Sequence, residues 1–133
     1  MKTLTALAAA ATLAIGMTPA MAEGPAERAQ ARLAEQLEGR TAGEPQACIN
    51  TANDNRLRVV ERVGLVYERG DTIWVARATN PDQLRYHDVP VIERFGSRLC
   101  KQDIIRTVDR NTGMISGALF LEDFIPYTLP ERG

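Results

Sequence analysis

Alternating side chains in the second half of the chain predict short β-strands. Residues 72–79, TIWVARAT, place Trp74 and Ala76 on one face and Ile73 and Val75 on the other. Strands that are apolar on both faces are usually covered on both sides or belong to a closed barrel. We therefore expect this strand either to be covered on both of its faces or to belong to a closed barrel.

Glycine-containing turns separate the predicted strands. Gly70 and Gly96 each stand first in a two-residue loop, which is typical of a tight hairpin. The turn at Gly96 predicts that residues 89–95 pair with residues 98–108. The second of these strands does not alternate cleanly, so we expect a bulge near residues 102–103.

Three further segments have strand-like patterns, namely residues 56–63, 65–69 and 114–121. Turn spacings of this kind are typical of an all-β domain of about six antiparallel strands. The sequence therefore predicts a mainly β fold over residues 48–128, either a small barrel or a sandwich.

A helical segment precedes the β region. Residues 23–40 are rich in good helix formers, with Pro25 suited to the first turn and Gly39 to the C-terminal cap. Their apolar stripe is thin, and a short helix with so small a stripe is marginal in water. We interpret residues 23–46 as a helical spacer and linker; the alternative is a helix that binds a partner.

The first 22 residues predict a secretory signal peptide. Lys2 is their only charge, an apolar run spans residues 4–15, and Pro19 precedes the small-residue cleavage site Ala-Met-Ala. A transmembrane anchor would need about 20 apolar residues. We therefore expect a periplasmic or secreted protein without stable membrane insertion after cleavage, with the β-domain spanning residues 47–133.

The net charge of the chain argues against nucleic acid and anionic lipid as partners. Removing Lys2 from the 16 basic residues leaves 15, against 17 acidic residues, so the predicted mature chain has a net charge of −2. A nucleic-acid-binding surface needs a basic face that displaces counterions, and anionic lipid favours clustered basic residues. We therefore expect no nucleic-acid partner and no lipid-binding role.

The two cysteines, Cys48 and Cys100, have a single possible pairing. Export favours a disulfide, which would close a loop of about 52 residues. Two free thiols, a metal site and a nucleophile are the alternatives. The chain has no C-x-x-C spacing, and His87 is its only histidine. The predicted hairpin would place Cys100 opposite residues 91–93.

Candidate catalytic residues are few. His87 and Asp88 are adjacent, and adjacent side chains in an extended segment point to opposite sides, which argues against a dyad. Neither Ser97 nor Ser116 has a nucleophile-elbow setting. We therefore predict no catalytic residue, no metal site and no cofactor.

Carboxylate pairs leave one enzymatic alternative open. Glycosidase chemistry needs two carboxylates about 5–10 Å apart across a cleft. The acidic residues that could supply such a pair are Asp103, Asp109, Glu122 and Asp123. A hydrolase of envelope polymers is accordingly the alternative function.

Four motifs occur in an order that resembles a known family. They are ACI (47–49), RLRVVE (56–61), GDTIWVAR (70–77) and SRLCKQDII (97–105). This order resembles the small exported proteobacterial proteins grouped as domain of unknown function 6491. The resemblance implies a β-rich exported domain and no known activity. Where that family has C-P-G-L, residues 81–84 lack cysteine, which implies that the pair retained here is Cys48–Cys100.

An arginine row is the first surface that we expect to bind a partner. Arg56, Arg58 and Arg62 are expected on one face of a strand, and a solvated strand face is the alternative. The sequence thus favours a non-enzymatic module that binds an envelope protein or a small ligand. A further alternative is a proteinaceous inhibitor of an envelope hydrolase, acting through residues 80–90.

Overall fold

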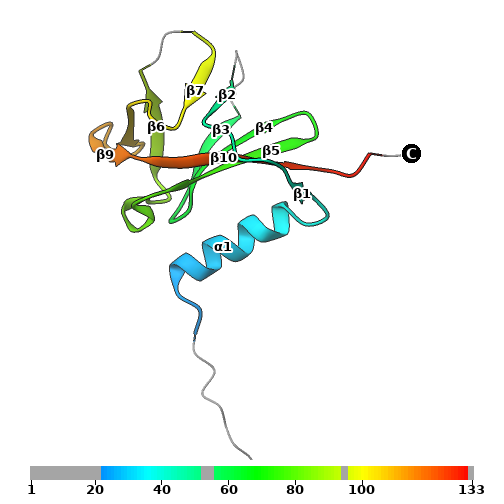
Figure 1. Ribbon diagram of the computed structural model, residues 1–133. Helices are drawn as coiled ribbons and strands as arrows, with labels where there is room; N and C mark the ends of the chain where they lie inside the picture. The colour runs from blue at the N-terminus through cyan, green and yellow to red at the C-terminus, as the bar shows by residue number, and fades with distance from the viewer. Residues whose placement is uncertain (1–21, 52–55, 94–95, 132–133) are drawn as a thin grey trace, which may run out of the picture.

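The computed structural model describes residues 22–51, 56–93 and 96–131 (Figure 1). The predicted signal peptide lies outside these residues, apart from Ala22. In the described ranges the chain forms one α-helix, one short 3-10 helix, η1 (Pro81–Gln83), and ten strands. The strands form three antiparallel sheets that do not close into a barrel, so the predicted mainly β fold is confirmed in its sandwich-like form.

The largest sheet has five strands in the order β1-β10-β5-β4-β3. Their bounds are β1 (Thr41–Ala42), β10 (Leu121–Thr128), β5 (Thr72–Ala78), β4 (Gly64–Arg69) and β3 (Leu57–Val60). The predicted hairpin between β4 and β5 is confirmed, since Arg69 pairs with Thr72 and Gly70 has a φ of +58°. A positive φ at the first loop position is the conformation that glycine adopts without steric cost.

Two smaller sheets lie over one face of the five-stranded sheet, and Figure 1 shows helix α1 (Pro25–Gln36) on the other side. One small sheet pairs β2 (Cys48–Asn50) with β7 (Arg98–Cys100). The other has the order β6-β8-β9, with bounds β6 (Asp88–Ile92), β8 (Ile105–Asp109) and β9 (Ile115–Leu119). The architecture therefore has three layers.

The core is divided by the five-stranded sheet. On one face Tyr67 and Phe124 pack with Leu99 of β7 and Ile105 of β8. On the other face a second cluster joins β4 and β5 to α1. Strands β4 and β5 are apolar on both faces because each face is covered, which is the first of the two alternatives that the sequence left open.

The expected spacer and linker, residues 23–46, are instead part of the folded domain. Leu33 of α1 is 2% exposed and packs with Val66 and Val75. Strand β1 then pairs with β10, and Gln46 forms a bridge with Phe124. The thin stripe suffices because tertiary packing, rather than propensity, supplies most of a helix's stability in a protein.

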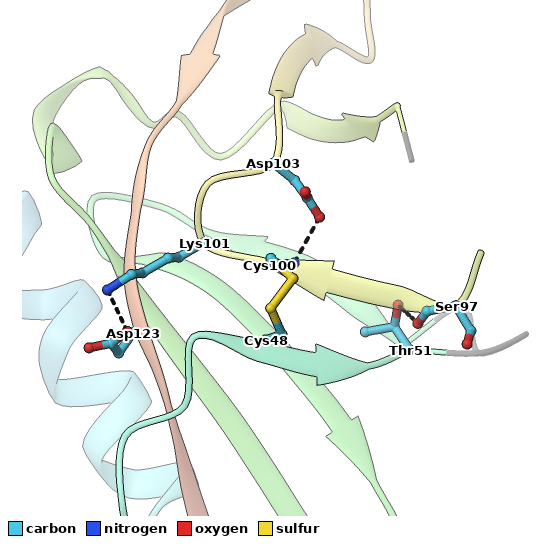
Figure 2. Close-up of a disulfide and its surroundings, with 7 residues drawn as sticks. All are labelled: Cys48, Thr51, Ser97, Cys100, Lys101, Asp103 and Asp123. Atoms are coloured by element: carbon cyan, nitrogen blue, oxygen red, sulfur yellow. Dashed lines mark hydrogen bonds and ion pairs between the residues drawn. A yellow bond between two sulfur atoms is a disulfide. The ribbon is translucent and has the colours of Figure 1, made fainter. Parts of the chain in front are cut away.

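The tight hairpin predicted at Gly96 is wrong, although residues 89–92 do pair with residues 105–108 of the predicted partner segment. Strand β6 pairs with β8, and β7 pairs with β2. The expected bulge is a turn that ends β7: the Asp103 carboxylate accepts a hydrogen bond from the Cys100 N–H at 2.8 Å (Figure 2). Cys100 therefore lies opposite Cys48 and not opposite residues 91–93.

The predicted disulfide is confirmed. Cys48 and Cys100 are direct partners in the β2–β7 pairing, and their sulfur atoms are bonded across 52 residues of sequence (Figure 2). The metal and nucleophile alternatives for these two cysteines are thereby removed. Within the described part of the chain, no helix has the length and apolar character that crossing a bilayer requires.

Candidate functional site

The end of β3 separates Arg62 from the other two arginines of the predicted row. Arg58 lies within this strand and Arg56 directly precedes it. Arg62 lies beyond the strand, in the turn to β4, where it has a φ of +55°. The expectation that the three arginines share one strand face is therefore wrong for Arg62, because the chain reverses after Val60.

The structure brings two of these arginines to a groove between α1 and β3. Arg58 lines a hollow of about 250 Å³, and Arg62 lines an adjoining hollow of about 300 Å³. The two hollows share Ala29, Arg32 and Glu61, so we treat them as one feature, the α1–β3 groove. Arg56 lines neither hollow.

The groove combines apolar side chains with four guanidinium groups. Its apolar part comes from Ala29 and Leu33 of α1 and from Val59 and Val60 of β3. Its charged and aromatic side chains are Arg28, Arg32, Arg58, Arg62, Glu61 and Tyr86. Glu61 is the only acidic residue among the described residues that line the groove, which leaves a local excess of three positive charges.

The helix supplies two of the arginines because of its periodicity. Arg28 and Arg32 are four residues apart, so they occupy the same side of α1. Each is followed by a residue, Ala29 or Leu33, that is buried against the sheet. Docking of the buried stripe therefore turns both arginines toward the groove.

The four guanidinium groups differ in the hydrogen-bond and ion-pair partners that they have. Arg58 donates to Gln36 and to Glu68, the latter at 3.3 Å. Arg62 lies 3.9 Å from Asp82, and Arg28 donates to a backbone carbonyl.

Arg32 makes no side-chain hydrogen bond or ion pair with any described residue. It is therefore the group most available to an anionic ligand.

Tyr86 places an aromatic ring at the groove. Its side chain is 68% exposed, and its ring meets the ring of His87 edge-on with 5.3 Å between centroids. His87 is exposed and lies in the turn before β6, whereas Asp88 is 4% exposed. The Asp88 carboxylate accepts a hydrogen bond from the Ser116 hydroxyl at 2.7 Å. This hydrogen bond links β6 to β9.

A β-bulge brings two of the four candidate carboxylates together. In the pairing of β10 with β5 the register shifts between Leu121 and Phe124, both of which are buried. Glu122 and Asp123 therefore both face outward and line a shallow hollow of about 670 Å³. Lys101 lies 2.7 Å from Asp123 across this hollow (Figure 2).

The other two candidate carboxylates serve local turns. Asp103 accepts from the Cys100 N–H, and Asp109 accepts from the Asn111 N–H at 2.7 Å. In the part of the chain that the structure describes, no group of three potential metal ligands is found. The hydrolase alternative thus has one adjacent pair of carboxylates, and one member of that pair is bound to a lysine.

Sequence reasoning missed Arg28, Arg32 and Tyr86. The four-residue spacing of the two arginines, next to the stripe of Ala29 and Leu33, is the signal that could have found the first two. No comparable signal marks Tyr86, whose place beside β3 depends on the fold.

No family model, curated protein or solved structure matches the chain. The resemblance to domain of unknown function 6491 therefore stays a prediction. The α1–β3 groove is the feature of the structure that bears on function.

Proposed function

We propose that the protein is an exported, non-enzymatic binding module that holds an acidic segment of a protein partner in the α1–β3 groove. The observation that carries this proposal is the cluster of four arginines around an apolar cleft with Glu61 as the one acidic lining residue. Export rests on the predicted signal peptide, and the disulfide supports it because disulfides persist in oxidising compartments.

The spacing of the helical arginines favours an extended peptide as the ligand. Arg28 and Arg32 are separated by about 6 Å along the axis of α1, given a rise of about 1.5 Å per residue. Alternate side chains of an extended chain repeat at about 6.8 Å, nearly the same interval. Two carboxylates at alternate positions can therefore pair with Arg28 and Arg32, while the intervening apolar side chain points the opposite way, toward Val60 of β3.

The test uses a short dye-labelled peptide in which glutamate alternates with leucine, with glutamine replacing glutamate in a control peptide. Fluorescence anisotropy should show saturable binding of the acidic peptide that weakens as salt is added, because ion pairs are screened. Arg32→Glu should lower the affinity at least tenfold. Arg110→Glu is the matched control, since Arg110 is exposed and lines neither hollow of the groove.

Two results would contradict the proposal. The first is equal binding of the glutamate and glutamine peptides. The second is an equal loss of affinity in Arg32→Glu and Arg110→Glu, which would show that overall charge and not the groove attracts the peptide.

A further inference from the structure

A separate hollow lies on the opposite face of the five-stranded sheet from α1. It has a volume of about 450 Å³ and lies between the β2–β7 pair and the β4–β5 hairpin. The side chains that give it chemical character are Trp74, Arg69, Arg98, Asn50, Gln46 and Cys48. None of these residues lines the α1–β3 groove.

Strand register places an aromatic and a cationic group on the same side of the hollow. Trp74 pairs with Tyr67, and Arg69 pairs with Thr72, so Arg69 and Trp74 lie diagonally on one face of the hairpin. Tyr67 is fully buried, whereas Trp74 packs against the core and stays partly exposed. The indole is therefore held firmly while part of its surface faces the hollow.

A second guanidinium group comes from the small sheet. Arg98 precedes the buried Leu99 in β7, so its side chain points away from the core. Neither Arg69 nor Arg98 makes a side-chain hydrogen bond or ion pair with a described residue. The hollow thus combines an indole surface with two guanidinium groups that no acidic residue compensates.

The disulfide fixes one wall of this hollow. Cys48 lines it, and its bond to Cys100 ties β2 to β7 at the end of their pairing. A wall held in this way needs little ordering when a ligand binds, and a preorganised site loses less free energy to that ordering.

We propose that this hollow binds an acidic saccharide, such as a hexuronic acid unit. The C–H face of the sugar ring would lie on the indole of Trp74, whose flat apolar surface suits it. The carboxylate would be held by Arg69 and Arg98, because the planar guanidinium fork matches a carboxylate. The amide of Gln46 can donate to and accept from ring hydroxyls.

The experiment uses the fluorescence of Trp74, which is the only tryptophan of the chain. The folded, oxidised protein is titrated with trigalacturonic acid and with its fully methyl-esterified form. We expect a saturable change in emission with the acid and at least tenfold weaker binding of the ester. A response to benzoate equal to that with the acid would overturn the assignment to saccharides.

Variants separate this hollow from the rest of the surface. Arg98→Gln should weaken binding of the acid at least tenfold, and Arg69→Gln provides a second test should the first variant fail to fold. Arg110→Gln is the matched control and should bind as the wild type does. Arg32→Glu should also leave saccharide binding unchanged, so failure of the α1–β3 groove proposal is distinguishable from failure of this one.

Absence of a saturable change in the wild type would refute the proposal. Unchanged affinity in folded Arg98→Gln and Arg69→Gln proteins would also refute it.

Discussion

Removing the Cys48–Cys100 bridge tests how the domain is stabilised. The bridge closes a loop of 52 residues, which contains β3, β4, β5, η1 and β6. In the chain-entropy treatment, releasing a loop of this length costs about 4 kcal/mol of stability, because the unfolded chain gains freedom. The loss is a large share of a typical domain stability of about 5–15 kcal/mol.

The remaining contacts should keep the variant folded. Ile49 and Leu99, which pair directly beside the bridge, are both buried in the larger core cluster. The double substitution Cys48→Ala/Cys100→Ala leaves these residues in place. We therefore expect a folded protein with reduced stability and not a disordered one.

Urea unfolding followed by circular dichroism measures the effect. With a slope of about 2 kcal/mol per molar urea, the expected loss lowers the midpoint by about 2 M. Wild type treated with reductant should unfold at the midpoint of the double variant, and reductant should not shift the double variant itself. A midpoint lowered by less than about 0.5 M would refute the reasoning from loop entropy.

Two further substitutions test the packing of the five-stranded sheet. Leu33→Ala should lower the free energy of unfolding by about 2–5 kcal/mol, because the side chain is buried between α1 and the sheet; a loss as small as that of Arg32→Ala in urea unfolding would contradict this. Gly64→Ala should cost at least about 3 kcal/mol in thermal unfolding, because a Cβ there would lie 2.1 Å from the Ala76 carbonyl oxygen. Gly117→Ala, whose nearest neighbour is 3.4 Å away, should be far milder.

Local patterns predicted the central strands but not all of the pairings. The alternation in residues 72–78 and the glycine at position 70 define the β4–β5 hairpin within one short stretch. The turn signal at Gly96 is equally local, yet β7 pairs with β2, about 50 residues earlier. Four strands separate the observed ten from the predicted six. Strands β1 and β2 have only two and three residues, too few to show a period. The predicted strand 98–108 forms two strands, β7 and β8, and β10 follows the last predicted strand.

The candidate site also combines residues that the local sequence indicates with an arrangement that depends on the fold. Arg58 and Arg62 could be selected as surface arginines, but the groove exists only because α1 packs beside β3. That packing depends on Val66 and Val75, which are distant in sequence from the helix. The outward pairing of Glu122 and Asp123 likewise depends on a register shift against β5, which no local pattern shows.

The position of β10 in the five-stranded sheet determines when during folding that sheet can be completed. It is the last strand of the five-stranded sheet in sequence, yet it lies between β1 and β5. As the chain emerges from its N-terminus, β3, β4 and β5 can pair with one another early, whereas β1 cannot pair with β10 until residue 128 has emerged. Phe124, a central core residue, arrives in the same step. Closure of the sheet is therefore a late event that joins distant parts of the chain, and pairing across such separations is slow.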